Sequence, residues 1–153
     1  MALGQLFSQR FGYAIHALAY MAKKPMDTLT TLPELASWMR SVWPSASEAY
    51  LSNVIQRLAR GGVLRSHRGV AGGYSLARDP ERITLRDVTE VIDGVCQDQC
   101  NLSLGAACPV QGLCAIQDVL HHVEEQHLEA LSRINFSEIA SQLMVQQPME
   151  ARV

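Results

Sequence analysis

All four cysteines of this chain lie within one stretch of nineteen residues. The rest of the 153-residue sequence contains none. Scattered cysteines are usually small buried side chains, whereas a group in one loop is typical of a metal site, an iron–sulfur cluster or a thiol switch. Seven residues separate Cys100 from Cys108 and five separate Cys108 from Cys114. Both loops can therefore fold back and bring three thiolates to one cluster. The fourth thiol is Cys96.

Charge is unevenly distributed along the chain. The formal net charge is −2, yet residues 47–78 carry five arginines against a single acid, Glu48. Such a segment has the positive charge that phosphate binding needs, although a solvated basic face has the same composition. No run of about 18 apolar residues is present, and the first ten residues lack the order of a secretory signal. We therefore expect a cytoplasmic protein without a membrane partner, in which thiols stay reduced and free to bind metal.

Three short helices are predicted ahead of the cysteines. Apolar residues at three- and four-residue steps predict a helix from Phe7 to about Lys24. Residues 31–34, Thr-Leu-Pro-Glu, match a capping box that opens a second helix, and residues 45–48, Ser-Ala-Ser-Glu, offer another that opens a third. Gly61 and Gly62 end the third helix. This spacing favours a helix-turn-helix unit.

A β-hairpin is predicted directly after the third helix. Residues 63–68 and 74–77 have the pattern of strands, and the glycine-rich residues 69–73 form the turn between them. A hairpin in this position is the wing of a winged helix. Its tip carries Arg68 beside glycines that let the backbone approach a phosphate or a groove closely. A permissive turn explains the same glycines.

Polar side chains on the third helix are candidate DNA contacts. The N-terminal half of a recognition helix enters the major groove, where polar groups pair with base edges. Ser47, Ser52 and Asn53 lie off the apolar face in that half, and Ser52 and Asn53 can read bases. Arg57 and Arg60 are better suited to hold phosphates. Each of these side chains can equally be solvated surface.

The order of these motifs resembles the Rrf2 family of winged-helix regulators, which includes iron–sulfur regulators of the IscR, NsrR and RirA types. The resemblance covers about residues 5–145. Its most specific part is Arg-Gly-x-x-Gly-Gly-Tyr-x-Leu-Ala at 68–77, followed by Ile-Thr-Leu at 83–85. It implies a mostly α fold with a small β-hairpin wing, in which a winged helix-turn-helix domain precedes a long C-terminal dimerisation helix. It also implies base contacts by Ser52 and Asn53, and a minor-groove contact by Arg68.

The resemblance further implies an iron–sulfur cluster, either [2Fe–2S] or [4Fe–4S]. Its three-cysteine spacing identifies the ligands as Cys100, Cys108 and Cys114. The fourth ligand differs from the family, because the histidine of IscR-like proteins is replaced by Gln117 and the carboxylate of NsrR-like proteins by Gly12. Cys96 is the nearest alternative. A structural zinc site, a thiol switch without metal, and cysteines left in a member that has lost its cluster stay open.

A long helix is predicted after the cysteines. Apolar residues recur at helical spacing from Ile116 to about Arg133. We expect this helix to make the protein a homodimer that reads a pseudo-palindromic double-stranded operator. The chain then divides into a winged-helix domain (1–93), a cysteine loop (94–115), a dimerisation helix with a short closing helix (116–145), and a frayed tail (146–153).

The function predicted from these features is iron–sulfur-dependent transcriptional regulation. We expect a repressor whose cluster state controls operator binding in response to iron, nitric oxide or redox conditions. The alternative is a cluster-free or zinc-stabilised winged-helix regulator that senses thiol oxidation or a small metabolite. An enzyme is disfavoured, because no Ser-His-Asp order, Walker loop or His-Glu-x-x-His pattern is present. Residues 38–44, with two tryptophans, make the link into the third helix longer than the family pattern and could shift that helix.

Overall fold

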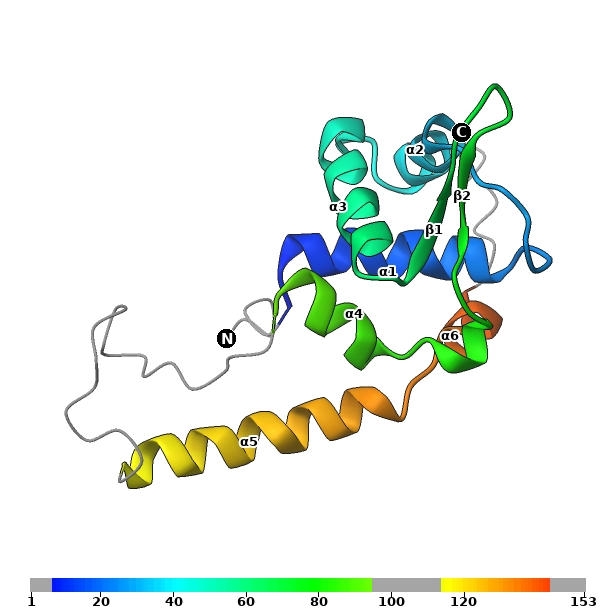
Figure 1. The fold of residues 1–153 in the computed structure, drawn as a ribbon. Coiled ribbons are helices and arrows are strands. Elements are labelled where there is room, and N and C mark those ends of the chain that lie inside the picture. The colour runs from blue at the N-terminus through cyan, green and yellow to red at the C-terminus, as the bar shows by residue number, and fades with distance from the viewer. Residues whose placement is uncertain (1–6, 95–113, 144–153) are drawn as a thin grey trace, which may run out of the picture.

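The computed structural model describes residues 7–94 and 114–143. Over these ranges it contains six α-helices, one short 3-10 helix and a two-stranded antiparallel sheet (Figure 1). In chain order they are α1 (Gln9–Ala22), α2 (Leu32–Val42), α3 (Glu48–Arg60), β1 (Leu64–His67), β2 (Gly73–Leu76), η2 (Pro80–Arg82), α4 (Leu85–Ile92), α5 (Ala115–Ser132) and α6 (Phe136–Gln142). The mostly α fold with a hairpin wing is confirmed. Within these ranges, no helix is both long and apolar enough to cross a membrane.

The core is built around α1. One side of this helix buries Phe11, Leu18 and Met21 together with three alanines, and α2, α3, α4 and α6 pack against it. The small alanines let neighbouring helices approach α1 closely. The buried faces of α3 and of the hairpin complete the same cluster. The helix-turn-helix, the wing and the closing helix therefore share one core.

The two predicted capping boxes form only in part. Thr31 caps α2 and accepts a hydrogen bond from the backbone N–H of Glu34, but the Glu34 carboxylate instead accepts hydrogen bonds from Lys24 and Tyr20. The prediction that Ser45 opens α3 is wrong by two residues. Ser47 is the N-cap of α3, and its Oγ accepts from the N–H of Tyr50. Glu48 lies in the first turn and pairs with Arg40 at 3.1 Å.

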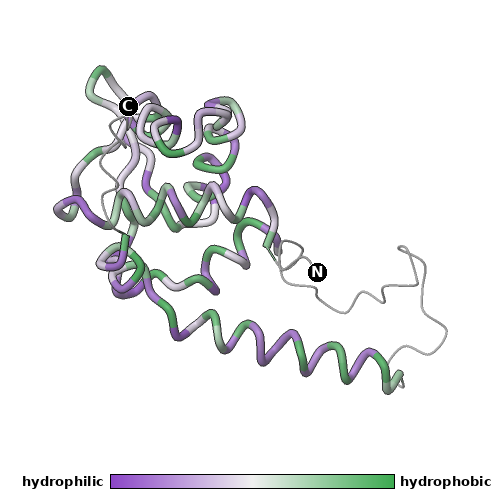
Figure 2. Tube along the Cα trace, turned by 180° about the vertical axis from the view of Figure 1, so that it is seen from behind, coloured by the Kyte–Doolittle hydropathy of each residue, from purple (hydrophilic) through white to green (hydrophobic). Residues whose placement is uncertain are grey.

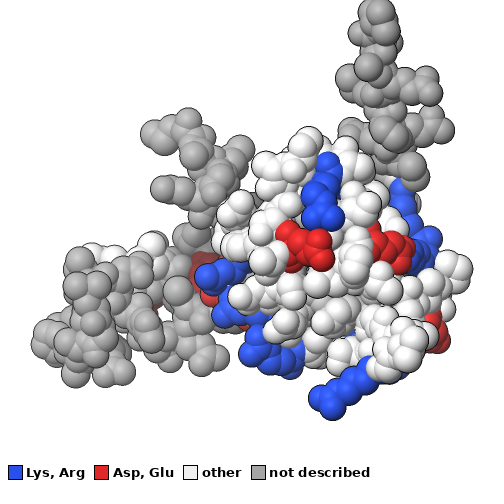
Figure 3. All heavy atoms as spheres, turned by 90° about the horizontal axis from the view of Figure 1, so that it is seen from above, with Lys and Arg blue, Asp and Glu red and all other residues white. Residues whose placement is uncertain are grey.

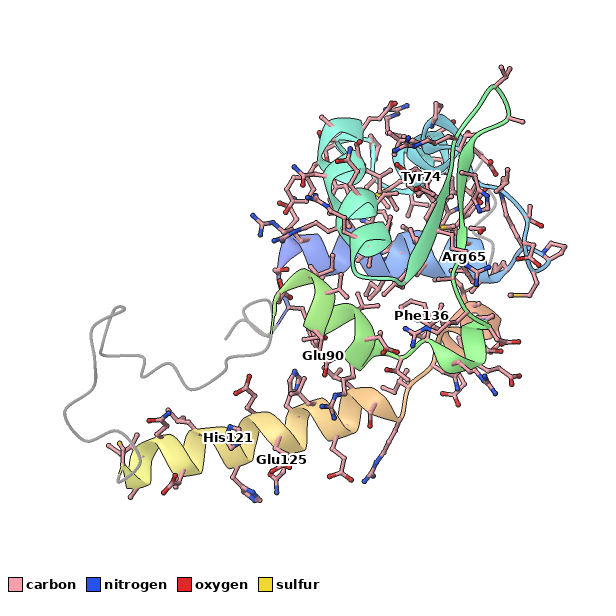
Figure 4. All side chains as sticks on the ribbon, in the orientation of Figure 1. Arg65, Tyr74, Glu90, His121, Glu125 and Phe136 are labelled. Carbon is pink, nitrogen blue, oxygen red and sulfur yellow. The ribbon has the colours of Figure 1, made fainter. Side chains whose placement is uncertain are left out.

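The hairpin is anchored to the turn between α1 and α2. Its register pairs Leu64 with Leu76 and His67 with Gly73. On its other edge, β2 pairs with the segment before α2, where the backbones of Thr30 and Tyr74 exchange two hydrogen bonds of 2.8 and 2.9 Å. A Cβ on Gly73 would lie 2.9 Å from the Thr30 carbonyl oxygen, so only glycine allows this close approach. Figure 4 shows Tyr74 on the side of the hairpin that faces the helices.

A fourth helix that the sequence pattern did not predict follows the wing. Its start is a complete capping box, in which Thr84 and Asp87 each bond the other's backbone N–H. The junction between α5 and α6 is held against this start, because Leu85 N–H donates to the Ile134 carbonyl and Phe136 N–H donates to the Ile83 carbonyl. The fully buried ring of Phe136 fixes α6 in the core (Figure 4).

The long helix α5 extends away from this body (Figure 1). Its C-terminal half packs on α4 and buries Leu128 and Leu131. Its N-terminal half reaches beyond the other helices, and Figure 2 shows hydrophobic residues recurring between hydrophilic ones along its length. The predicted helix from Ile116 to about Arg133 is thus confirmed within one residue at each end.

Candidate nucleic-acid interface and cysteine segment

The N-terminus of α3 is held in place by α1 and α2. The backbone N–H of Ser47 donates to the Tyr13 hydroxyl at 3.0 Å, and the ring of Tyr13 lies edge-on to that of Tyr50. The Arg40–Glu48 ion pair adds a contact to α2. Ser47 therefore uses both its side chain and its backbone to fix the helix start. We expect any DNA contact by Ser47 to depend on the groups that this cap leaves exposed.

One stripe of α3 faces outward along the whole helix. Its four members are exposed and recur at three- and four-residue steps: Ala49, Asn53, Gln56 and Arg60. Ser52 lies beside this stripe, half-buried, and its Oγ accepts a hydrogen bond from Gln56 Nε2 at 3.3 Å. Of the predicted contacts, the structure thus brings Ser52, Asn53 and Arg60 to one side of the helix. Ala49 and Gln56 are exposed on the same side and were not among the predicted contacts. Helical spacing from Asn53 could have identified both.

Arg57 occupies a different environment from the other predicted DNA contacts. Its side chain is half-buried, and Nη1 donates to the carbonyl oxygen of Ile92 at 3.1 Å. Ile92 is the last residue of α4, where unpaired carbonyls and the helix dipole favour a cation. At least one guanidinium donor of Arg57 therefore holds the fold together. The prediction that Arg57 holds phosphates therefore leaves out its contact with α4.

The wing carries Arg68 near its tip, close to the exposed Val70. Gly69 has a φ of 111°, a conformation that L side chains rarely adopt, and Gly72 lies against the carbonyl oxygen of His67. These glycines are explained by the turn itself. Arg68 is exposed, and no ion pair involves it within the described residues. The start of α3 and the wing tip lie on the same side of the molecule (Figure 1).

This side is not uniformly basic. Figure 3 shows basic and acidic side chains mixed on this face, both near its middle and towards its margin.

Both tryptophans of residues 38–44 make aromatic contacts, although Trp38 lies within α2 and Trp43, which follows α2, is 42% exposed. Trp38 lies against the ring of Tyr20 at 4.7 Å between centroids, and Trp43 lies edge-on to His16 at 4.3 Å. Glu34 joins this region by accepting from the Tyr20 hydroxyl at 2.8 Å and from the ammonium of Lys24. Burial, reinforced by Glu34, raises the pKa of Tyr20 to about 12. The hydrogen bond from Lys24 lowers the pKa of Glu34.

Of the four cysteines, Cys114 lies within the described residues. It is the N-cap of the 18-residue helix α5, it is half-buried, and its thiol makes no capping hydrogen bond. The other predicted ligands, Cys96, Cys100 and Cys108, lie outside the described residues. Over the described ranges, no group of three or more metal-binding side chains occurs.

The architecture defined here is that of winged-helix regulators. A comparison with protein families matches residues 7–142 to Rrf2, described as iron-dependent transcriptional regulators. The chain belongs to the Rrf2 family, whose members are DNA-binding transcriptional regulators and not enzymes.

Individual relatives agree with this assignment. A protein of Aquifex aeolicus (strain VF5), named as an HTH-type transcriptional regulator, is 36% identical over 86 residues, which cover 56% of each chain. The structure of CymR, the global cysteine regulator of B. subtilis, has a TM-score of 0.64 at 25% identity and covers 88% of this chain and 95% of its own. The structure of T. potens IscR has a TM-score of 0.64 at 23% identity, with 92% and 90% covered, and supports the fold.

Proposed function

We propose that this chain is a homodimeric, cytoplasmic repressor that binds a pseudo-palindromic operator and whose affinity for DNA depends on an iron–sulfur cluster. The observation that carries the proposal is the position of the cysteine segment. It begins just after α4, whose last carbonyl accepts a hydrogen bond from Arg57 of α3, and it ends at Cys114, the N-cap of α5. Along the chain, the four thiols therefore follow the recognition helix and precede the proposed dimer helix.

The thiols fit an iron–sulfur cluster chemically. Thiolates are its usual ligands, and the spacing of Cys100, Cys108 and Cys114 follows the family pattern, with Cys96 as the candidate fourth ligand. When bound, a cluster would supply a redox-sensitive centre whose state is set by iron, oxygen or nitric oxide. The residues around it would hold it and connect it to the DNA-binding surface.

Two contacts at the end of α4 provide that connection. Ser8, the N-cap of α1, donates a hydrogen bond to the carboxylate of Asp93 at 2.5 Å. Arg57 donates a hydrogen bond to the backbone carbonyl of Ile92, the residue before Asp93. A rearrangement of the segment that follows Gly94 would displace these acceptors and so bias the position of α3. Such a switch requires two arrangements that differ in free energy and that the cluster stabilises unequally.

A cluster-free regulator is the second candidate. The likeness to CymR favours it, since that structure is described as a cysteine regulator and belongs to the same fold. In this alternative the thiols bind zinc or respond to oxidation, or a small metabolite is sensed elsewhere. The winged helix, the dimer and the operator remain as in the first proposal.

The two candidates are separated by anaerobic purification of the full chain. We expect a coloured protein with iron and acid-labile sulfide in similar amounts. Single changes of Cys100, Cys108 or Cys114 to Ala should each remove the colour, and Cys96→Ala tests the fourth ligand. A colourless protein that holds stoichiometric zinc, or no metal, would exclude the cluster and leave the second candidate.

DNA contacts are tested on operator fragments selected with the purified protein. Asn53→Ala should reduce the free energy of operator binding by about 1–3 kcal/mol. It should also relax the sequence preference at one position of the operator. Arg68→Ala should lower affinity by tenfold or more. Ser37→Ala, an exposed change on α2, serves as the control. Unchanged affinity and preference in the Arg68 variant would remove the wing from the proposed interface.

The connection through Arg57 is tested by a matched pair on the same helix. Arg60 bonds only a carbonyl of its own helix in the described structure, whereas Arg57 bonds α4. Arg60→Ala should weaken operator binding equally in the cluster-loaded and cluster-free protein. Arg57→Ala should reduce the difference between the two forms. Equal behaviour of both variants would contradict the connection.

A further inference from the structure

A cavity of about 330 Å³ lies beside the start of the recognition helix. Its walls come from α1, from Met39 of α2 and from the link between α2 and α3, and include Gly12, Tyr13, His16 and Trp43. Ligand cavities begin near this volume, and it accommodates a molecule of one or two rings. The floor is the bare backbone of α1 at Gly12, where an added Cβ would meet nothing within 4 Å.

The lining restricts the chemistry of an occupant. Three aromatic rings, those of Tyr13, His16 and Trp43, and the side chain of Met39 provide apolar and polarisable surface. Lysine, arginine, aspartate and glutamate are all absent from the described residues of the lining. A charged ligand would therefore be desolvated without an opposite charge, which is costly. A flat, uncharged aromatic molecule matches these walls, because aromatic rings attract one another edge-to-face and offset.

The lining also carries hydrogen-bonding side chains, among them Gln9, Ser45 and His16. Nδ1 of His16 lies 2.6 Å from the carbonyl oxygen of Gly12, which only accepts, so Nδ1 carries the proton. In the tautomer with its proton on Nδ1, the ring has an acceptor at Nε2. The matching ligand carries an N–H or O–H donor.

We propose that this cavity is a binding site for a small, uncharged heteroaromatic or phenolic molecule with one hydrogen-bond donor, and that its occupancy alters the presentation of α3. The site reaches the recognition helix through two routes. Tyr13 accepts the hydrogen bond from the backbone N–H of Ser47, the N-cap of α3. Trp43 and Ser45 line the cavity and belong to the link that leads into α3. The effect on DNA rests on the proposed operator binding, whereas occupancy itself does not.

Occupancy is measured on the full-length protein without DNA. Trp38→Phe leaves Trp43 as the chain's single tryptophan, so its fluorescence and calorimetry report binding in the cavity. The probes are benzimidazole and phenol, with benzoate as the charged control and cyclohexanol as the non-aromatic control. We expect saturable binding of the first two and at least tenfold weaker binding of the controls. No saturable binding of either aromatic probe, or equal binding of benzoate, would overturn the proposal.

Two variants locate the site. A Cβ at position 12 meets nothing within 4 Å, so Gly12→Ala should leave most of the binding, whereas the longer side chain of Gly12→Leu enters the cavity and should weaken binding of the aromatic probes by tenfold or more. Trp43→Leu should also weaken it while keeping an apolar wall. Retained binding in both Gly12→Leu and Trp43→Leu would place the probes elsewhere and contradict the assignment.

The effect on α3 is measured as operator affinity with and without saturating probe. Thermodynamic coupling of this kind changes affinity by about fivefold or more. If the probe saturates the protein without changing its operator affinity, the proposed coupling to α3 is rejected, whereas the proposed binding site is retained. A protein that binds the probes yet shows no specific DNA binding would instead contradict the proposed function.

Discussion

The two halves of α5 meet different environments although one apolar stripe runs through both. In the C-terminal half, Leu128 and Leu131 are only 8% and 5% exposed, because α4 and the body of the domain cover them. In the N-terminal half, Ile116, Val119 and Val123 are 72%, 63% and 56% exposed. Helical periodicity predicts that the apolar stripe of α5 packs against another surface. It does not predict whether that surface belongs to the same chain or to a second one.

This difference separates folding from assembly along a single helix. The covered half contributes to the stability of one chain. The exposed half presents four large apolar side chains to solvent, and apolar side chains grouped in this way are typical of an interaction site. In the proposed homodimer, the second copy covers it.

The largest effect is expected in the covered half. Leu131→Ala should lower the free energy of unfolding by about 2–5 kcal/mol, because it leaves a cavity between α5 and the domain. The measurement is urea unfolding at a fixed protein concentration, with Glu129→Ala, an exposed neighbour, as control. A loss below about 0.5 kcal/mol would mean that this half is held loosely.

The next effect is expected in the exposed half. Ile116→Ser combined with Val123→Ser should weaken self-association by about tenfold or more per residue, since each exchange removes apolar surface from the proposed interface. Sedimentation equilibrium measures the dissociation constant, and circular dichroism checks that helix content is kept. Gln126→Ser, an exposed polar residue of the same helix, is the control. An unchanged dimer constant would place the interface elsewhere.

A smaller effect is expected at the boundary between the halves. The ring of His127 lies 5.8 Å from that of Phe7, which itself stacks on Phe11. His127→Ala should cost about 1 kcal/mol or less of unfolding free energy. His122→Ala, an exposed change beyond that contact, should cost nothing measurable in thermal unfolding. If His122→Ala lowers the free energy of unfolding as much as His127→Ala does, the covered half of α5 extends further towards the helix start than the contacts indicate.

The smallest effect is a pH dependence that belongs to the domain body and not to α5. The pKa of Glu34 is lowered by Lys24, so its stabilisation is present above the ordinary glutamate pKa and is lost as the pH falls through the lowered value. Because the Glu34 side chain is 38% exposed, solvent screening keeps this contribution below about 1 kcal/mol. Glu34→Gln should flatten the acid side of the stability curve equally in dimeric chains and in the Ile116/Val123 double variant. A difference between the two backgrounds would tie Glu34 to assembly.

Much of the fold follows from local signals in the sequence. Apolar spacing gave α1 to α3 and α5, and the glycine-rich turn at 69–73 gave the wing. The helix α4 was missed although Thr84 and Asp87 have capping spacing, because its eight residues are too few for a clear period. The N-cap of α3 was misplaced from Ser47 to Ser45, since both serines precede an acid and only the hydrogen bond from Tyr50 selects one.

The candidate site was less predictable than the fold. The outward position of Asn53 and Arg60 follows from helical spacing, because the apolar face of α3 fixes the opposite one. The bond from Arg57 to Ile92 joins residues 35 positions apart, and no local pattern encodes it. The aromatic cavity combines side chains of α1 with those of the link into α3, so it too depends on tertiary packing.

The paired hydrogen bonds between Thr30 and Tyr74 bear on how this protein could be engineered. The hairpin is joined to the turn before α2 as a third strand would be, with Gly73 pressed against the Thr30 carbonyl. A chimera that imports another wing would have to carry its own matching turn, or keep glycine at position 73. Under the proposed DNA interface, operator specificity would instead be redesigned on α3 and the wing tip alone, where side chains change without disturbing this backbone junction.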